Sequence, residues 1–129
     1  MAANRFEFNT VADNRASVGG TRVGGVLCDI VGFSAPNNLV VRNTVGGSAS
    51  VANAQTLGGC TFPTSTVGPD VTGLSFVSPD VPPQDYHLSS GSSAIDQATT
   101  PSSTITVDVD GDVRPQGAQK DRGADEYKP

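Results

Sequence analysis

The sequence is poor in aromatic residues, histidine and basic charge. It has no tryptophan, and its one histidine and two cysteines are too few for a four-ligand zinc site. Its eight lysines and arginines are scattered along a chain of formal net charge -5, which argues against nucleic-acid binding. No apolar run approaches the roughly 18 residues of a membrane span, and the start of the chain lacks the features of a signal peptide.

Residues that favour strands and turns are abundant instead. Valine, threonine, serine, asparagine and glycine dominate, whereas the straight-chain residues that favour helices are scarce. This composition predicts an all-β chain with many turns and little helix. A length of 129 residues suits a single domain, 1–129, that can bury a core without help from a metal ion.

Two short echoes indicate an internal repeat. The letters NTV occur at 9–11 and at 43–45, a shift of 34, and glycine-cysteine segments at 24–28 and 57–60 are shifted by 32. The intervening strands leave no room for helical crossovers, so we expect a β-solenoid in which each strand pairs with its equivalent in the next coil. On its own, the NTV echo is equally consistent with coincidence in a chain of this composition.

Stacked coils make specific predictions about side chains. Superposition of the NTV segments places Asn9 over Asn43, with the asparagine amides hydrogen-bonded in a ladder inside a turn. The same superposition places Thr10 over Thr44 and Val11 over Val45. Cys28 and Cys60 then fall on neighbouring coils, whose spacing permits a disulfide, although a stacked pair of free thiols is the alternative.

The pattern changes in the second half of the chain. Prolines at 79, 82 and 83 interrupt ladder hydrogen bonding, so we expect β-helix coils over 4–67 and a terminal half-coil with a capping segment over 68–129. The segment SGSSAIDQA, 90–98, is the best candidate for a short helical turn, with a serine at its N-cap.

Five phrases in the second half carry a family resemblance. They are Phe76–Pro79, Asp85–Leu88, Gly91–Asp96, Asp108–Pro115 and Asp121–Tyr127. Their order resembles the C-terminal signature of bacterial right-handed parallel β-helix proteins of the pectin-lyase-like superfamily, in the pattern described as choice-of-anchor Q. The chain departs from the pattern at Ser93, where proline is usual, and at Arg122, where an aliphatic residue is common.

The resemblance implies a few terminal coils followed by a closing segment, in a protein that is exported or displayed at the cell surface. An export signal is then expected to lie outside this chain. The resemblance does not imply an enzyme.

The charged run near the C-terminus is similar to a calcium-binding loop. Asp108, Asp110 and Asp112 alternate like the first ligands of an EF-hand loop, but Val113 replaces the turn glycine and Gln119 replaces the bidentate glutamate. These three aspartates are therefore weak calcium candidates, and no cofactor is otherwise predicted.

A hairpin with its turn at Asp110-Gly111 is the preferred interpretation of the same run. The preceding TITVDV alternates strictly, which is typical of a strand. The carboxylates of Asp121, Asp125 and Glu126 are expected to accept hydrogen bonds from backbone amides or to pair with nearby arginines.

Catalytic residues are not identified. Only Asp13, Arg15, Asp29 and Arg42 on the coils have the side chains that polysaccharide lyases or hydrolases use, and their spacing matches no signature. They are interpreted as solvated surface. His87 has no partner cysteine and no nucleophile elbow is present, so a hydrolytic triad is not expected.

The sequence therefore predicts an all-β, right-handed parallel β-helix, with a few C-terminal coils and an irregular or hairpin closing segment. The function expected is non-catalytic and structural or binding, in an extracellular or cell-surface protein. A polysaccharide-binding or polysaccharide-cleaving module and a calcium-dependent adhesion module are the alternatives. Self-association through an exposed N-terminal coil at Arg5–Phe8 and binding of a polysaccharide are the expected interactions, with no nucleic acid and no membrane span.

Overall fold

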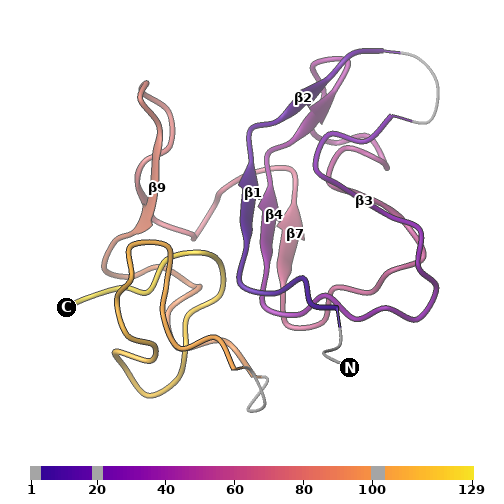
Figure 1. Ribbon diagram of the computed structural model, residues 1–129. Coiled ribbons are helices and arrows are strands. Elements are labelled where there is room, and N and C mark those ends of the chain that lie inside the picture. The colour runs from indigo at the N-terminus through magenta and orange to yellow at the C-terminus, as the bar shows by residue number, and fades with distance from the viewer. Residues whose placement is uncertain (1–3, 19–21, 100–103) are drawn as a thin grey trace.

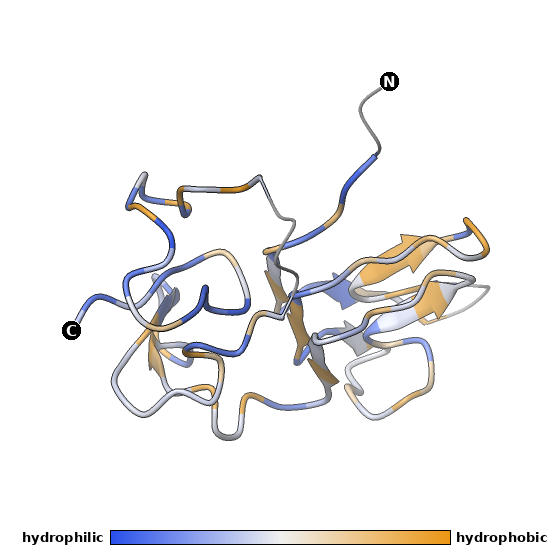
Figure 2. Cartoon of the chain, turned by 90° about the horizontal axis from the view of Figure 1, so that it is seen from below, coloured by the Kyte–Doolittle hydropathy of each residue, from blue (hydrophilic) through white to orange (hydrophobic). Residues whose placement is uncertain are grey.

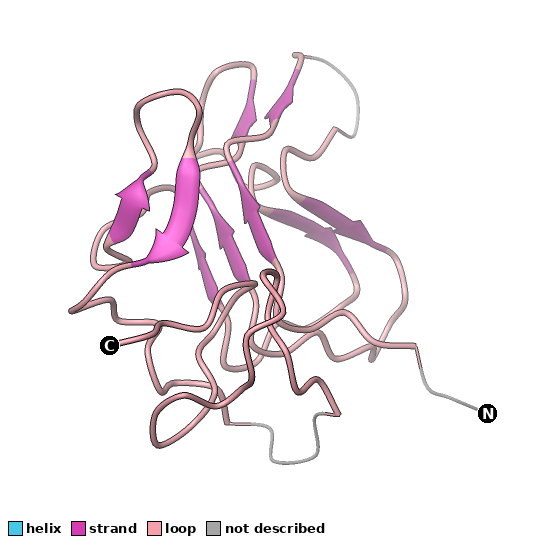
Figure 3. Ribbon diagram, turned by 60° about the vertical axis from the view of Figure 1, so that its left-hand side comes forward, coloured by secondary structure: helices cyan, strands magenta, loops and turns pink. Residues whose placement is uncertain are grey.

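The chain folds as a set of very short β-strands joined by turns. A computed structural model describes residues 4–18, 22–99 and 104–129. No helix occurs among these residues, so the predicted all-β class is confirmed (Figures 1 and 3). The strands are β1 (Thr10–Ala12), β2 (Arg15–Ala16), β3 (Val26–Cys28), β4 (Leu39–Val41), β5 (Thr44–Val45), β6 (Thr56–Gly58), β7 (Thr66–Gly68), β8 (Phe76–Ser78) and β9 (Asp85–Leu88).

Strands in the first half pair in parallel with strands that come much later in the sequence. The order of the central sheet is β1-β4-β7, while β2 pairs with β5 and β3 pairs with β6 (Figure 1). Residues that are hydrogen-bonded between these paired segments are 27, 29 or 30 positions apart in the sequence. We call residues 8–16 the first repeat and residues 37–45 the second repeat. All of these sheets are small and open.

The register between the repeats differs from the predicted one. Thr10 lies opposite Leu39 rather than opposite Thr44. A pair of asparagines at the same spacing recurs in both repeats, as Asn9 and Asn14 in the first and as Asn38 and Asn43 in the second, which also contains Asn37. The NTV echo aligns the first asparagine of one pair with the second asparagine of the next. The expected superposition of 9–11 on 43–45 is therefore wrong by one asparagine spacing.

Asparagine side chains nevertheless link the repeats in a ladder. Asn38 Oδ1 accepts hydrogen bonds from the backbone N–H and the Nδ2 of Asn9, both at 2.9 Å. Asn43 Oδ1 accepts the same two bonds from Asn14, both at 3.0 Å. Asn38 and Asn43 are fully buried, and a buried amide is costly unless it is paired. Each rung of the ladder therefore favours this register over its neighbours.

The ladder through Asn14 and Asn43 ends on Gln55. The Oε1 atom of Gln55 accepts hydrogen bonds from the backbone N–H and the Nδ2 of Asn43, both at 3.1 Å. Asn43 accepts an equivalent pair of bonds from the backbone N–H and the Nδ2 of Asn14. The third strand of the central sheet, β7, ends at Gly68 opposite Val41, and this register places Asp70 rather than an asparagine at the position equivalent to Asn43.

A recurring backbone conformation produces the corners of the repeats. Phe8, Asn37 and Thr64, each placed two residues before a strand of the central sheet, have φ angles of 57°, 60° and 54°. Asp13 and Arg42, directly after β1 and β4, have φ angles of 57° and 55°. Such left-handed angles are uncommon outside glycine, so their recurrence marks equivalent positions in successive repeats. The side chains of Asp13 and Arg42 therefore leave neighbouring corners.

The middle strand of the central sheet, β4, is buried on both faces. Val40 faces Gly25, where an added Cβ would lie 3.0 Å from Val40 Cγ1 and 2.3 Å from the Gln55 carbonyl oxygen. Leu39 and Val41 pack on the other face with apolar side chains of the C-terminal half, Leu74, Phe76, Leu88 and Ala94. Figure 2 shows hydrophobic residues along these stacked strands, which lie between the C-terminal half and the other strands.

The closing segment lies across the face of this sheet. Gly123 N donates to Asn37 O at 2.9 Å, and Ala124 N donates to Thr10 Oγ1 at 3.0 Å. A Cβ on Gly123 would approach Leu39 Cδ1 to 2.7 Å, so only glycine fits at this contact. The C-terminal residues therefore pack on the side of β1 and β4.

Buried carboxylates hold the closing segment in shape. Asp121 accepts hydrogen bonds from the backbone amides of Asp96 and Tyr127, both at 2.7 Å. Glu126 accepts from the amides of Gln116 and Asp121, both at 2.9 Å. The expectation that these acidic residues bond backbone amides is confirmed.

Two local predictions for the C-terminal half need correction. Val107 and Val113 form a single antiparallel bridge, and the turn spans residues 108–112 instead of the two residues predicted. The Asp108 carboxylate causes this, because its Oδ1 accepts the amides of Asp110 and Asp112 at 2.9 and 2.8 Å and wraps the chain around itself. Segment 90–98 forms hydrogen-bonded turns but no helix.

Candidate functional site

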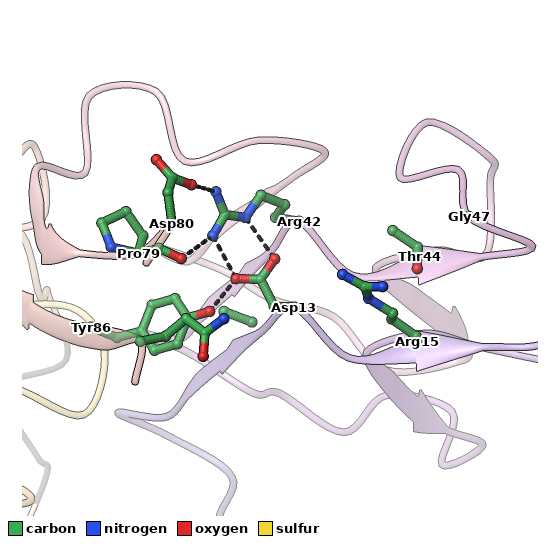
Figure 4. A pocket seen from close by; sticks show the side chains of 10 residues that line it. Asp13, Arg15, Arg42, Thr44, Gly47, Pro79, Asp80 and Tyr86 are labelled. Atoms are coloured by element: carbon green, nitrogen blue, oxygen red, sulfur yellow. Dashed lines mark hydrogen bonds and ion pairs between the residues drawn. The ribbon is translucent and has the colours of Figure 1, made fainter. Parts of the chain in front are cut away.

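The most developed depression lies at the corners of the two repeats. It is an open pocket of about 760 Å³ between these corners and the segment that joins β8 to β9 (Figure 4). Its lining is mostly polar and charged, and comprises Ala12, Asp13, Arg15, Arg42, Thr44, Gly47, Pro79, Asp80, Gln84 and Tyr86. The stacking of the repeats brings residues from separate parts of the chain to one place.

Arg42 is the centre of the pocket. Its Nε and Nη2 atoms donate to the two carboxylate oxygens of Asp13, each at 2.6 Å. This bidentate geometry follows from the fold, because Asp13 and Arg42 occupy the equivalent corner in successive repeats. The pair therefore clamps the first repeat to the second.

The same guanidinium also binds the C-terminal half. Nη2 donates to the Pro79 carbonyl oxygen at 2.7 Å, and Nη1 pairs with the Asp80 carboxylate. The Tyr86 hydroxyl donates to Asp13, which completes the group (Figure 4). We call Asp13, Arg42, Asp80 and Tyr86 the Arg42 network. It joins both repeats to the segment between β8 and β9.

The protonation states follow from these contacts. Partial burial raises the pKa of Asp13, but hydrogen bonds from Arg42 and Tyr86 outweigh it and leave this pKa below its ordinary value. The hydrogen bond to Asp13 raises the pKa of Arg42 above its ordinary value. Burial and the neighbouring Asp13 carboxylate raise the pKa of Tyr86. Asp13 is therefore anionic at neutral pH, and the tyrosine stays a neutral donor.

These states disfavour catalysis by the network. A general base needs a pKa near the working pH and an oxygen that is free to take a proton. Asp13 has a lowered pKa, and both of its oxygens already accept hydrogen bonds. The network has the features of a structural clamp instead.

Arg15 is the second arginine in the pocket lining, and unlike Arg42 its guanidinium is free to bind a ligand. It is exposed on β2, and it makes no hydrogen bond or ion pair with the residues that the structure describes. In the paired strand β5, the Oγ1 atom of Thr44 opposite Arg15 is buried without a hydrogen-bond partner in that part of the chain. Figure 4 shows Arg15 beside Thr44, apart from the Arg42 network.

Sequence reasoning named three residues of this pocket but interpreted them as solvated surface, which is wrong for the partly buried ion pair of Asp13 and Arg42. Of the four candidate residues on the coils, the fold brings together Asp13, Arg15 and Arg42, whereas Asp29 lies after β3 beside Gly58. Asp80 and Tyr86 were missed, because nothing in their local sequence says which corner they contact. A search for the asparagine spacing of the repeats would have identified Asp13 and Arg42 as equivalent positions.

The three calcium candidates are used in different ways. Asp108 accepts three backbone amides, from Asp110, Asp112 and Glu126. The Asp112 carboxylate pairs with Lys128 Nζ at 2.6 Å, whereas Asp110 contacts the imidazole of His87 at 2.7 Å. Backbone amides thus occupy the oxygens of Asp108, while Lys128 and His87 contact the other two carboxylates. Binding of calcium here stays a prediction.

The two cysteines are joined in the structure. Cys28, at the end of β3, and Cys60, just after β6, form a disulfide with 5.6 Å between their Cα atoms. This distance lies inside the usual range for such bonds. The bridge links the paired strands β3 and β6 on the side remote from the closing segment (Figure 1).

Comparison of the chain with known proteins identified no relative. No family model matches the chain, and no curated protein or solved structure is significantly similar to it. The resemblance to the pectin-lyase-like superfamily therefore stays a prediction from the sequence.

Proposed function

We propose that this chain is a non-catalytic structural or binding module from the C-terminal part of a right-handed parallel β-helix. The observation that carries the proposal is the repeat of parallel pairing, asparagine rungs and left-handed corners at 27 to 30 residues. Each feature recurs at equivalent positions, as expected for coils that stack along one axis. The closing segment then protects one face of the stacked strands.

Export to an oxidising compartment is part of the proposal. The Cys28–Cys60 disulfide supports it, because such bonds persist outside the reducing cytosol. Among the residues that the structure describes, no helix is long and apolar enough to cross a membrane.

Binding of an acidic polysaccharide in the pocket is the second candidate. The available guanidinium of Arg15 favours it, since arginine binds carboxylates through a planar pair of donors. Tyr86 and Gln84 supply further polar groups in the same lining.

The decisive experiment separates binding from cleavage. The chain is incubated with acidic and neutral polysaccharides, product ends are measured, and binding is followed by calorimetry. We expect no product release, and any affinity for acidic chains should fall about tenfold in Arg15→Gln because a charge-assisted bond is lost. The matched control Arg22→Gln, outside the pocket lining, should bind normally. Product release that disappears in Asp13→Asn would establish an enzyme and overturn the non-catalytic proposal.

A further inference from the structure

The only histidine of the chain lies in a group of carboxylates away from the Arg42 network. His87, on β9, contacts Asp85 Oδ1 through Nδ1 at 2.5 Å and Asp110 Oδ2 through Nε2 at 2.7 Å. Asp125 is the third acidic neighbour. One nitrogen of His87 and one oxygen each of Asp110 and Asp125 lie within 4.8 Å of one another.

Asp125 is the unusual member of this group. It is only 8% exposed, and its Oδ2 accepts a hydrogen bond from Leu88 N at 2.6 Å. Its other oxygen receives no hydrogen bond from the described part of the chain. Asp125 and His87 line the same cavity of about 210 Å³. Asp125 therefore keeps one oxygen that the described part of the chain leaves free for a ligand.

The orientation of His87 suits metal binding. A metal-bound histidine commonly donates its second ring N–H to a carboxylate, which fixes the tautomer and directs the other nitrogen at the ion. Asp85 is placed to accept the Nδ1 proton of His87. Nε2 is directed at Asp110 Oδ2 on the exposed turn 108–112, and a bound ion would take the place of the proton between these two atoms.

We propose that His87 Nε2, Asp110 and Asp125 bind one divalent ion of the zinc class, with Asp85 holding the imidazole in place. An imidazole with two carboxylates suits such ions, whereas calcium takes oxygen ligands alone. In tetrahedral coordination, zinc bonds of about 2.1 Å place two ligand atoms about 3.4 Å apart, so ligand atoms that now lie within 4.8 Å of one another must approach by up to about 1.4 Å. The ion links the closing segment to β9, and its positive charge offsets the negative charge of the three surrounding carboxylates.

This site is distinct from the calcium candidates of the sequence. It shares Asp110 with them but takes its other ligands from β9 and from residue 125, far apart in the chain. Asp108 is engaged by backbone amides, and Asp112 by Lys128. The proposal also stands apart from the proposed function, because neither His87 nor Asp110 contributes to the Arg42 network.

The test is a zinc titration of the full chain without any polyhistidine tag. Because His87 is the only histidine, its imidazole gives one set of NMR signals, and we expect saturation at one equivalent with Nε2 shifted more than Nδ1. Excess zinc should raise the melting temperature by roughly 5–15 °C, and a chelator should reverse the rise. Magnesium and calcium should have little effect.

Variants identify the ligands. His87→Gln and Asp110→Asn should weaken zinc binding at least about tenfold. Both side chains are substantially exposed, so both variants should fold, which circular dichroism checks. Asp112→Asn is the matched control on the same turn and should bind normally. Unchanged imidazole signals, an equal loss in Asp112→Asn, or stabilisation by calcium but not by zinc would each overturn the proposal.

Discussion

At the scale of single residues, Arg42 has the most connections of any charged group in the pocket. Its guanidinium is bonded to one residue of the first repeat and to two residues between β8 and β9. Its side chain is 24% exposed, so these contacts are only partly screened by water. A charged side chain of the second repeat thus links the two halves of the chain.

The pH dependence of stability should report this link. The pKa of Asp13 is lowered in the folded chain, so its contribution is fully present above the unfolded carboxyl pKa of about 4. The contribution is lost as the pH falls through the lower, folded pKa. We therefore expect wild type to be more stable than Asp13→Asn at pH 6, with a difference that shrinks below about pH 4.

Urea unfolding of both proteins between pH 6 and pH 2.5 measures this difference. Asp29→Asn, which alters an aspartate directly after β3 and outside the pocket lining, is the control and should show no such convergence. A difference for Asp13→Asn that stays constant across the whole range would exclude the link as its source.

At the scale of elements, the strands are too short to be stable on their own. A strand of two or three residues forms few backbone hydrogen bonds, and the asparagine ladders and left-handed corners add the bonds that hold one repeat on the next. Asn38 shows the principle, because its Nδ2 donates to the carbonyl oxygens of Phe6, Ala35 and Pro36. One amide therefore closes a turn and also joins two repeats.

Interior and edge rungs of the ladder should differ in their contribution to stability. Asn38→Ala removes a fully buried side-chain amide that bonds both the first repeat and its own turn, and we expect a loss of about 3 kcal/mol in the free energy of unfolding. Asn9→Ala removes the partly exposed amide of the same ladder, which has a repeat on one side only, and should cost about 1 kcal/mol. Chemical denaturation measures both, and equal losses would contradict the ladder.

At the scale of the whole molecule, the stacked strands leave edges open. Within the described residues, β1, β2 and β3 each have a partner on one side only, as do β5, β6 and β7 at the other end. Phe8, two residues before β1, is covered, because the Arg114 guanidinium lies 4.8 Å from its ring centroid. The open feature is therefore the row of strand edges rather than an apolar surface.

We propose weak self-association through these edges. Unpaired strand edges are templates for further pairing, and lysine at an edge opposes it. Light scattering should show a mass that rises with concentration, and Asn14→Lys should shift the chain toward monomer. Ser50→Lys adds the same charge to an exposed site of the later layer and is the control. A monomer at all concentrations would refute the proposal.

The sequence by itself determined the all-β class, the presence of stacked asparagines and the structural use of the C-terminal carboxylates. These follow from residue type, because β-branched residues favour strands, and buried asparagines and carboxylates need hydrogen-bond partners wherever they lie. The tertiary structure alone decided the register, the composition of the Arg42 network and the meeting of His87, Asp110 and Asp125. Such contacts depend on the register between one repeat and the next. Because the repeats contain similar asparagines at two positions, the sequence is compatible with more than one register, and the hydrogen bonds of the buried amides decide between them.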